Sequence, residues 1–230
     1  MELIWDSLRQ ALHMILTADP TVLDAGFRSL WISAIAVTGA GIVGLPLGSL
    51  LARVRFPARR IIITLFRAGM AVPTVFIGLL CFAFFERHGP LGPYDLLFTP
   101  GAIMAGEFLL ALPLVVTISH GAIAALDPRV AETAKSLGAG LVRRWLTYLS
   151  EAKTGILVAM MTAFSRCVTE LGIAMMVGGN IKERTQTLTT ATALETGQGE
   201  FARGLAMGLI LLLIAMIVTS LIVFLGREDE

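Results

Sequence analysis

The sequence predicts an all-α membrane protein with about five transmembrane helices, because apolar residues are abundant and clustered. Hydrophobic residues make up 56% of the 230 residues and charged residues only 15%, whereas a soluble domain carries about 25% charged residues. The mean hydropathy is +0.80. Five apolar runs are long enough to cross a hydrocarbon core, which needs about 20 residues of helix: residues 27–52, 61–85, 101–125, 155–178 and 204–225. These runs and their connections use the whole chain, so we expect a single transmembrane domain over residues 1–230, with the five-span bundle at 27–225.

Ahead of the first run, residues 1–20 predict an amphipathic helix. Leucines and isoleucines recur there at helical spacing, with polar residues on the other faces of the turn. This pattern suits either the membrane interface or packing against the bundle. Asp19-Pro20 ends this helix, and Asp24 is a candidate N-cap for the first span. The N-terminus lacks a basic stretch followed by an apolar core and a small-residue cleavage site, so we expect no cleaved signal peptide.

Basic residues gather on one side of the predicted bundle. If the first run starts outside, ten of the 18 lysines and arginines fall in two short inside loops and the C-terminal tail. Cytoplasmic loops of membrane proteins carry such an excess. The bias therefore predicts an outside N-terminus and a cytoplasmic C-terminus. The residues assigned to the inside are Arg53, Arg55, Arg59, Arg60, Arg129, Lys135, Arg143, Arg144, Lys153 and Arg227.

The first run carries a small residue at every fourth position, namely Ala36, Ala40, Gly44 and Gly48. Residues four apart share one face of a helix. A face of small residues lets a second helix approach closely, so we expect a helix contact along it, with a partner that the sequence does not name. Pro46 is expected to kink or loosen the inner end of this helix.

The second and third runs each contain a proline and a charge. Pro73 lies midway along residues 61–85, where it frees a backbone carbonyl. Such breaks persist where they face protein or a water-filled cavity. Arg67, near the inner end of the second run, and Glu107, in the third, are intramembrane charges. Such residues usually face the interior of the bundle, so both are candidates to lie behind the residues that line a substrate path and to support them.

The fourth run contains the polar stretch SRCVTELG. Arg166 and Glu170 are four residues apart and share one helix face. A charge at mid-bilayer costs about 2.5–3.5 kcal/mol on insertion scales. Two interpretations remain open. In the first, the charges neutralise each other or hold neighbouring helices. In the second, Arg166 binds an anionic substrate that Glu170 orients, since a guanidinium suits an oxyanion. In the second interpretation Ser165 and Thr169 belong to the same path.

Between the third and fourth runs, residues 131–151 form the long polar-to-amphipathic stretch on the inside. The stretch opens with ETAKSLGA. We expect Glu132 in the first turn of a short helix, where a carboxylate suits the positive helix end. Small residues such as Ala134 let this helix lie close to a partner. Gly138, followed by Ala139, breaks the helix and lets the chain turn back.

Several stretches carry a resemblance to a known family. ETAKSLGA resembles the Glu-Ala-Ala…Gly motif in the cytoplasmic loop of ABC-importer permeases. Phe164-Ser165-Arg166, followed by Glu170 and Gly172, is similar to a segment of molybdate, tungstate and sulfate permeases. MMVGGNIKERTQTLTTATALET at 175–196, HGPLG…LLFTP at 88–100 and ALDPRVAETAKSLGA at 125–139 look more specifically like the tungstate branch. By resemblance the chain is identified as a type I ABC-importer permease of this oxyanion group.

This resemblance implies partners and a mechanism. A homodimer of the chain would bind two cytoplasmic ATPase subunits and an oxyanion-binding protein outside, in a bacterial or archaeal cell inner membrane. The oxyanion would pass along the dimer axis by alternating access. Residues 188–203 would include an outside helix that contacts the binding protein, or one that only caps the bundle. The residues implied for ATPase coupling are Glu132, Thr133, Ala134, Gly138 and Ala139.

Motifs for catalysis or metal binding are absent from the sequence. No Gly-x-x-x-x-Gly-Lys-Ser/Thr loop is present, so we do not expect this chain to bind ATP by that route. His13, His88 and His120 are scattered, and no metal, cofactor or nucleic-acid partner is expected. Cys81 and Cys167 fall within runs and are expected to pack as small side chains without a disulfide. No nucleophile lies at an informative spacing from a base, so an enzyme is not expected.

One alternative function belongs to a different class. In an ion-coupled carrier, Arg166, Glu170 and Glu107 would form a proton relay and no nucleotide would be needed. The lack of a detectable inverted repeat speaks against such a carrier. The sequence also leaves open whether the oxyanion is tungstate, molybdate or sulfate.

Overall fold

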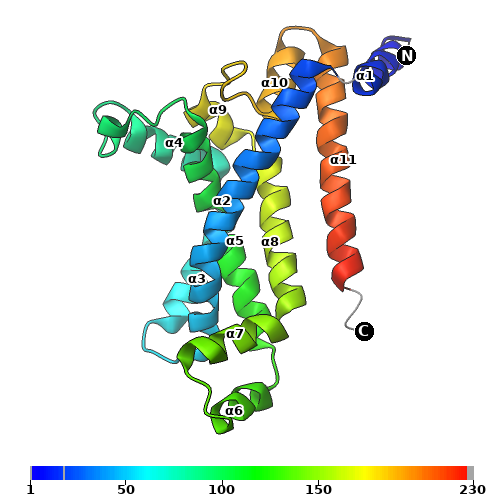
Figure 1. The fold of residues 1–230 in the computed structure, drawn as a ribbon. Coiled ribbons are helices and arrows are strands. Elements are labelled where there is room, and N and C mark those ends of the chain that lie inside the picture. Colours follow the sequence, from blue (N-terminus) through cyan, green and yellow to red (C-terminus); the bar gives the residue numbers. More distant parts are fainter. Residues whose placement is uncertain (1, 18, 227–230) are drawn as a thin grey trace.

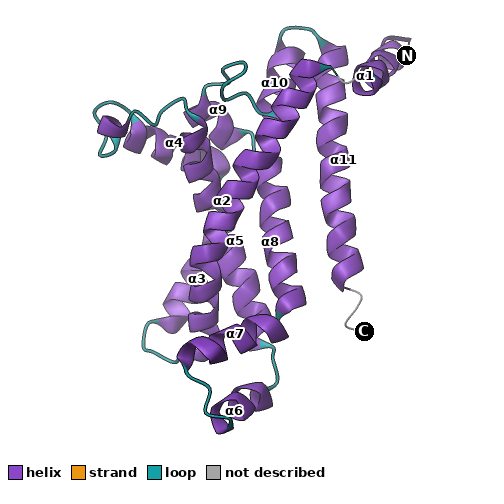
Figure 2. Ribbon diagram, in the orientation of Figure 1, coloured by secondary structure: helices purple, strands orange, loops and turns teal. Residues whose placement is uncertain are grey.

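The structure of the chain, a computed structural model, describes residues 2–17 and 19–226, and its regular elements are all helices (Figure 2). Four long helices lie side by side and set the length of the molecule (Figure 1). They are α2 (Pro20–Arg53), α5 (Pro100–Ala124), α8 (Lys153–Val168) and α11 (Phe201–Gly226). The predicted all-α fold is therefore confirmed.

Shorter helices mark the two ends of this bundle (Figure 1). At one end, the α6 end, lie α6 (Pro128–Ser136) and α7 (Leu141–Glu151), and α3 (Arg59–Gly69) runs beside α5 there. Toward the other end, the α10 end, lie α1 (Glu2–Leu16), α4 (Thr74–Phe85), η1 (Gly92–Tyr94), α9 (Gly172–Gly178) and α10 (Leu188–Gly197). The tail 227–230, with the Arg227 that was assigned to the inside, is outside the described residues.

Three of the described helices, α2, α5 and α11, are long and apolar enough to cross a membrane. The two other predicted spans are bent pairs: α3 meets α4 at 101°, and α8 meets α9 at 58°. If each pair is one span, the total is the five that the sequence predicts. The observed helices follow the predicted runs closely, except that the first begins at Pro20 rather than at residue 27.

Pro73 explains the break between α3 and α4. α3 ends at Gly69, and α4 begins at Thr74 with Pro73 as its N-cap. Proline has no N–H to continue a helix, and it disfavours a helical conformation in the residue before it. Beyond the break, α4 packs on α9, where Gly78 and Gly172 leave room for the opposing helix. The interruption was expected, but the separation into two nearly perpendicular helices was not.

α2 is longer than predicted because Asp19 is its cap. The Asp19 side chain accepts a hydrogen bond from the Thr21 N–H at 2.9 Å, and Pro20 fills the first helical position, where no N–H is needed. The Thr21 hydroxyl also donates to Asp19, and this side-chain hydrogen bond lowers the pKa of the Asp19 carboxyl. The prediction that Asp24 is the cap was wrong: Asp24 lies within the helix and pairs with Arg28 at 2.5 Å.

α2 packs along α5 through the predicted face of small residues. All four of these residues are buried, and two of them touch α5 directly. A Cβ added to Gly44 would lie 2.9 Å from Val115, and one added to Gly48 would lie 2.3 Å from the Ser119 hydroxyl. The close helix contact is confirmed, and its partner is α5. α2 runs as one helix through Pro46 to Arg53.

Gly48→Ala is expected to destabilise the bundle. The added methyl group would clash with the Ser119 hydroxyl and approach the Val116 carbonyl to 3.1 Å, and overpacking costs about 1–3 kcal/mol. Thermal unfolding of the purified chain in detergent measures the loss. Gly121→Ala on α5 is the matched control, because no atom lies within 4 Å of its added Cβ. Equal midpoints for the two variants would contradict the close packing of α2 on α5.

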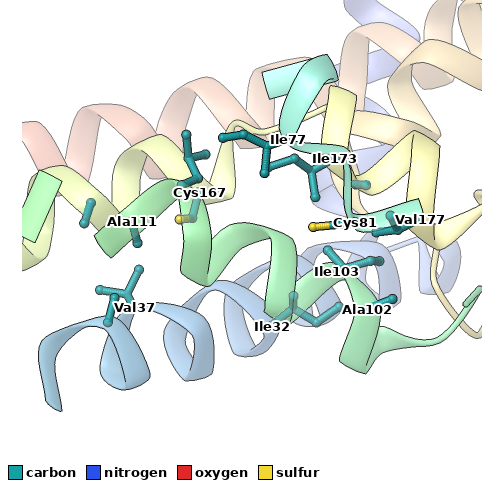
Figure 3. Close-up of a cluster of buried hydrophobic side chains, with 14 of the residues drawn as sticks. Ile32, Val37, Ile77, Cys81, Ala102, Ile103, Ala111, Cys167, Ile173 and Val177 are labelled. Atoms are coloured by element: carbon teal, nitrogen blue, oxygen red, sulfur yellow. The ribbon is translucent and has the colours of Figure 1, made fainter. Parts of the chain in front are cut away.

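The central core lies where α2, α4, α5, α8 and α9 meet (Figure 3). Ile32, Ile103 and Ile173 are fully buried there. Cys81 and Cys167 belong to the same cluster, and both are free and buried. This confirms that they pack as small side chains without a disulfide. The core joins both bent pairs to the long helices.

The predicted N-terminal amphipathic helix is present as α1, which packs against α11. Trp5, Leu12 and Leu16 are exposed on it. Two residues of the predicted range 1–20, residues 1 and 18, lie outside the described part of the chain.

Candidate functional site

The break between α8 and α9 brings together the charges predicted for the substrate path. α8 ends at Val168 and α9 begins at Gly172, so Glu170 lies in the connection rather than within a helix. Arg166 Nη1 still donates to Glu170 Oε2 at 2.9 Å, so the two charges pair although only Arg166 lies on the helix. The side chain of Glu170 is 2% exposed and that of Arg166 is 43% exposed. The guanidinium therefore extends outward from a buried carboxylate.

Backbone groups hold Glu170 in place. Its Oε1 accepts hydrogen bonds from the N–H groups of Gly172 at 2.8 Å and Ile173 at 3.3 Å, at the start of α9, where a carboxylate is favoured. Its carbonyl accepts from the Thr189 hydroxyl at 2.8 Å. Within the described residues, the only hydrogen bond that the Arg166 side chain donates is the one from Nη1 to Glu170. Since 43% of the Arg166 side chain is exposed, a ligand can reach it.

Ser165 and Thr169 flank Arg166. The Thr169 hydroxyl donates to the Ser165 carbonyl at 3.0 Å and to the Arg166 carbonyl at 3.2 Å, the local back-bonding that Ser and Thr side chains form with carbonyls three and four residues earlier. Thr169 is exposed and Ser165 is half-buried. The four residues predicted for the path thus lie together, and their contact with a substrate stays a prediction.

Of the two other predicted intramembrane charges, Arg67 and Glu107, only Glu107 contacts α8, the helix that carries Arg166. Glu107 on α5 is 2% exposed, and its carbonyl accepts from the Cys167 thiol at 3.6 Å. Among the described residues, Glu107 Oε2 and the Ser33 hydroxyl have no hydrogen-bond partner. Arg67 is exposed on α3 and forms no ion pair within the described chain. The structure therefore does not bring Arg67 and Glu107 together.

A buried row of threonines lies beside the break, which the sequence did not predict. Two of these threonines form a reciprocal capping box at the start of α10. Arg28 on α2 donates to the Gln186 carbonyl at 2.9 Å, and the Leu188 N–H donates to the Ser29 hydroxyl at 2.8 Å. The helix expected within residues 188–203 is present, but its first turn is buried in the bundle. The buried threonines are Thr185, Thr187, Thr189 and Thr190.

α6 is the short helix predicted after the third span, and it projects beyond the ends of the long helices (Figure 1). It begins at Pro128, with Asp127 as its N-cap. Glu132 therefore lies in the second turn, and its predicted place in the first turn was wrong because the helix starts earlier. Glu132 and Thr133 are exposed, whereas Ala134 is buried.

Gly138 ends α6, as predicted. Its φ of +71° lies in the left-handed region, which glycine adopts without strain. The Gly138 N–H donates to the Lys135 carbonyl and the Ala139 N–H donates to the Ala134 carbonyl, each at 3.0 Å. This pair of bonds is the Schellman motif. The chain then enters α7, a second helix that the sequence analysis did not separate from α6.

α7 crosses the α6 end of the bundle and is tied to α2. Trp145 Nε1 donates to the Ser49 hydroxyl at 3.1 Å. The Arg53 guanidinium lies 4.7 Å from the centre of the Tyr148 ring, a cation–π contact. The sequence did not predict these contacts, although Trp145 and Tyr148 lie three residues apart and so share a helix face that could have been expected to pack on another helix. Since α6 packs on α7, these contacts connect α6 to α2 through α7.

Known proteins resemble this chain over most of its length. A sequence-family model described as the binding-protein-dependent transport system inner membrane component matches residues 44–228. The tungstate uptake system permease protein TupB of Campylobacter jejuni is 38% identical, over 94% of this chain and 90% of the relative. TupB of Peptoclostridium acidaminophilum is 32% identical, over 99% and 100%. The molybdenum transport system permease protein ModB of Escherichia coli is 29% identical, over 94% and 98%.

Solved structures share the fold. The MetNI methionine ABC transporter, in an inward-facing conformation, has a chain that superimposes with a TM-score of 0.69 at 17% identity, covering 91% of this chain and 99% of that one. An amino acid ABC transporter gives 0.66 at 16% identity, over 93% and 96%. At these identities the likeness concerns the fold alone, and it confirms the predicted type I importer architecture.

Proposed function

The chain belongs to the family of binding-protein-dependent transport system inner membrane components, and we propose that it carries tungstate as a homodimer driven by partner ATPases. It is a multi-pass membrane protein and the permease subunit of an ABC oxyanion importer. Two relatives above 30% identity are named for tungstate uptake, which supports tungstate over molybdate or sulfate. The whole chain acts as one permease domain without a cofactor of its own.

The observation that carries this proposal is the position of α6. The helix is capped at both ends, projects from the bundle and packs on α7, which is bonded to α2. Each ATPase subunit binds α6 through Glu132, Thr133 and the surface around Ala134, Gly138 and Ala139. The α6 end is then cytoplasmic, the N-terminus lies outside and the C-terminus lies in the cytoplasm. ATP hydrolysis belongs to the partner subunits.

Arg166 is the residue of this chain that meets the oxyanion in transit. The support is its geometry: a half-exposed guanidinium, oriented by a buried carboxylate, on a broken helix. Charge-assisted hydrogen bonds from a guanidinium fork suit the oxygens of a tetrahedral anion. Closure of the ATPases brings the α6 helices together, and the spans rock between inward- and outward-facing states. A binding protein delivers the oxyanion at the α10 end.

The choice of oxyanion is tested with the complete importer. The permease, its ATPase and its binding protein are reconstituted in proteoliposomes with ATP inside, and uptake of tungstate, molybdate and sulfate is measured in competition. We expect tungstate to accumulate and a large excess of sulfate to compete weakly. Preferred uptake of sulfate would contradict the tungstate assignment and leave the importer mechanism standing.

The Glu107→Gln substitution distinguishes the ATP-driven importer from the alternative of an ion-coupled carrier. The amide keeps the size of the side chain but cannot relay a proton. Because Glu107 has no hydrogen bond to the Arg166–Glu170 pair, we expect ATP-driven uptake to stay within about threefold of the wild type, the small change typical of a non-essential contact. Uptake into proteoliposomes with and without ATP measures this. Uptake that persists without ATP, and is lost in Glu107→Gln, would favour the carrier instead.

A further inference from the structure

A cavity of about 640 Å³ opens at the α6 end, between the end of α2, the connection to α3, and helices α6 and α7. Five basic side chains line it and no carboxylate does. The chain as a whole has a formal net charge of only +1, so positive charge is concentrated at this place. The basic lining residues are Arg53, Arg55, Arg59, Lys135 and Arg144.

Two of these guanidinium groups have N–H donors without an acceptor. Within the described chain, Nε and Nη2 of Arg53 and Nε of Arg144 are buried and have no hydrogen-bond partner. None of the five basic residues takes part in the ion pairs of the described residues. Buried donors of this kind are normally satisfied. An anion in the cavity would supply the counter-charge that the described chain does not provide for the five cations.

The walls of the cavity hold two of these cations, Arg53 and Arg59, in fixed positions. Arg53 stacks on Tyr148 at 4.7 Å. Arg59 Nε donates to the Leu51 carbonyl at 2.5 Å, which folds the connection back onto the end of α2. Trp145 is fixed by its hydrogen bond to Ser49. Because these supports exist before a ligand arrives, the cavity is organised for binding rather than a loose cluster of surface charges.

We propose that this cavity binds a phosphate-like oxyanion group, carried by an anionic lipid headgroup or by a free anion. Its volume falls in the range of small-molecule sites, about 300–1,000 Å³, and exceeds what a bare oxyanion needs. Leu50, Val54 and Leu141 line it beside the cations and are exposed, which suits the glycerol and first methylenes of a lipid. The site is separate from Arg166 and does not depend on the transported substrate.

The next cavity on α7 supplies a matched control. Arg143 lines that cavity together with Asp127 and Glu151, so carboxylates stand beside its positive charge. Arg144→Gln and Arg143→Gln remove the same charge from adjacent positions of one helix. Only the first removes a donor from the cavity that lacks acidic residues.

Fluorescence of Trp145 reports on the cavity, because this residue lines it. The chain has 3 tryptophans, and Trp5→Phe with Trp31→Phe leaves Trp145 as the reporter. The full-length chain is purified in neutral detergent without its ATPase. It is titrated with inorganic phosphate and with tungstate against sodium chloride of equal ionic strength. It is also placed in phosphatidylcholine nanodiscs with and without phosphatidylglycerol.

We expect a saturable change in Trp145 emission. Arg144→Gln should lower the affinity by about tenfold, the effect of one charge-assisted hydrogen bond. Arg143→Gln should leave the affinity within about twofold of the wild type. Arg53→Lys, which keeps the charge but loses the fork, should weaken binding partly. A response to free anions alone identifies an aqueous anion site, and a response to phosphatidylglycerol alone identifies a lipid site. No response, a response matched by chloride, or equal loss in the two glutamine variants would overturn the proposal.

Discussion

Replacing α6 with a flexible linker of equal length is expected to abolish ATP-driven uptake while the spans still assemble. α6 contributes little to the core of the bundle, because it projects from it and packs mainly on α7. Its removal should therefore take away the proposed ATPase contact and leave the fold intact. The measurements are ATPase stimulation and tungstate uptake in proteoliposomes, with size-exclusion chromatography as the test of assembly.

Glu132→Lys is the corresponding point variant. The Glu132 side chain is exposed and lies on α6, so reversing its charge leaves the fold intact and acts on the docked partner. Loss of a central interface contact costs about 2 kcal/mol or more, so uptake should fall by about thirtyfold. Asp6→Lys is the control, because Asp6 is an exposed carboxylate on α1, far from α6. Wild-type ATPase coupling in Glu132→Lys and in the linker variant would contradict the role of α6.

Arg166→Gln is expected to reduce transport by about a hundredfold or more. The substitution removes the guanidinium that we propose as the oxyanion contact, and a group that supplies two charge-assisted hydrogen bonds contributes about 3 kcal/mol or more. It also leaves the buried Glu170 carboxylate without its counter-charge, although the two backbone N–H bonds to Glu170 remain. The single variant alone therefore mixes a loss of substrate binding with a loss of stability.

The double variant Arg166→Gln, Glu170→Gln separates these two effects. It removes both charges, so no unpaired carboxylate is left in the interior. If Arg166 binds the oxyanion, the double variant recovers thermal stability but not transport. Transport that returns along with stability would show that Arg166 serves only to neutralise Glu170. The measurements are unfolding midpoints in detergent and initial uptake rates at saturating tungstate.

Apolar clustering predicts the number and position of the spans, because hydrophobic length is a local property of the sequence. The small-residue face of α2 and the glycine that ends α6 were also predictable, since each depends on spacing or on a single backbone conformation. Asp19 could have been identified as the cap of α2 from the Pro20 that follows it. Asp24 was expected instead because hydropathy alone places the start of the span near residue 27.

The angles and long-range contacts could not be predicted in this way. Pro73 predicts an interruption, but the angle of 101° depends on how α4 packs against α9. Glu170 lies outside the helix, and its side chain accepts hydrogen bonds from the first N–H groups of α9 at Gly172 and Ile173. Helical periodicity does not predict this arrangement. The bond from Trp145 to Ser49 joins residues 96 positions apart. A single sequence carries no signal that pairs such distant residues.

The central claim is that α6 faces the cytoplasm and is gripped by an ATPase. Accessibility of one cysteine tests it most directly: Glu132→Cys is introduced after both native cysteines, Cys81 and Cys167, are replaced by alanine. A membrane-impermeant maleimide should label residue 132 in inside-out vesicles but not in intact cells, and bound ATPase should block the reaction. Labelling from outside the cell, or labelling that the ATPase does not slow, would contradict the account.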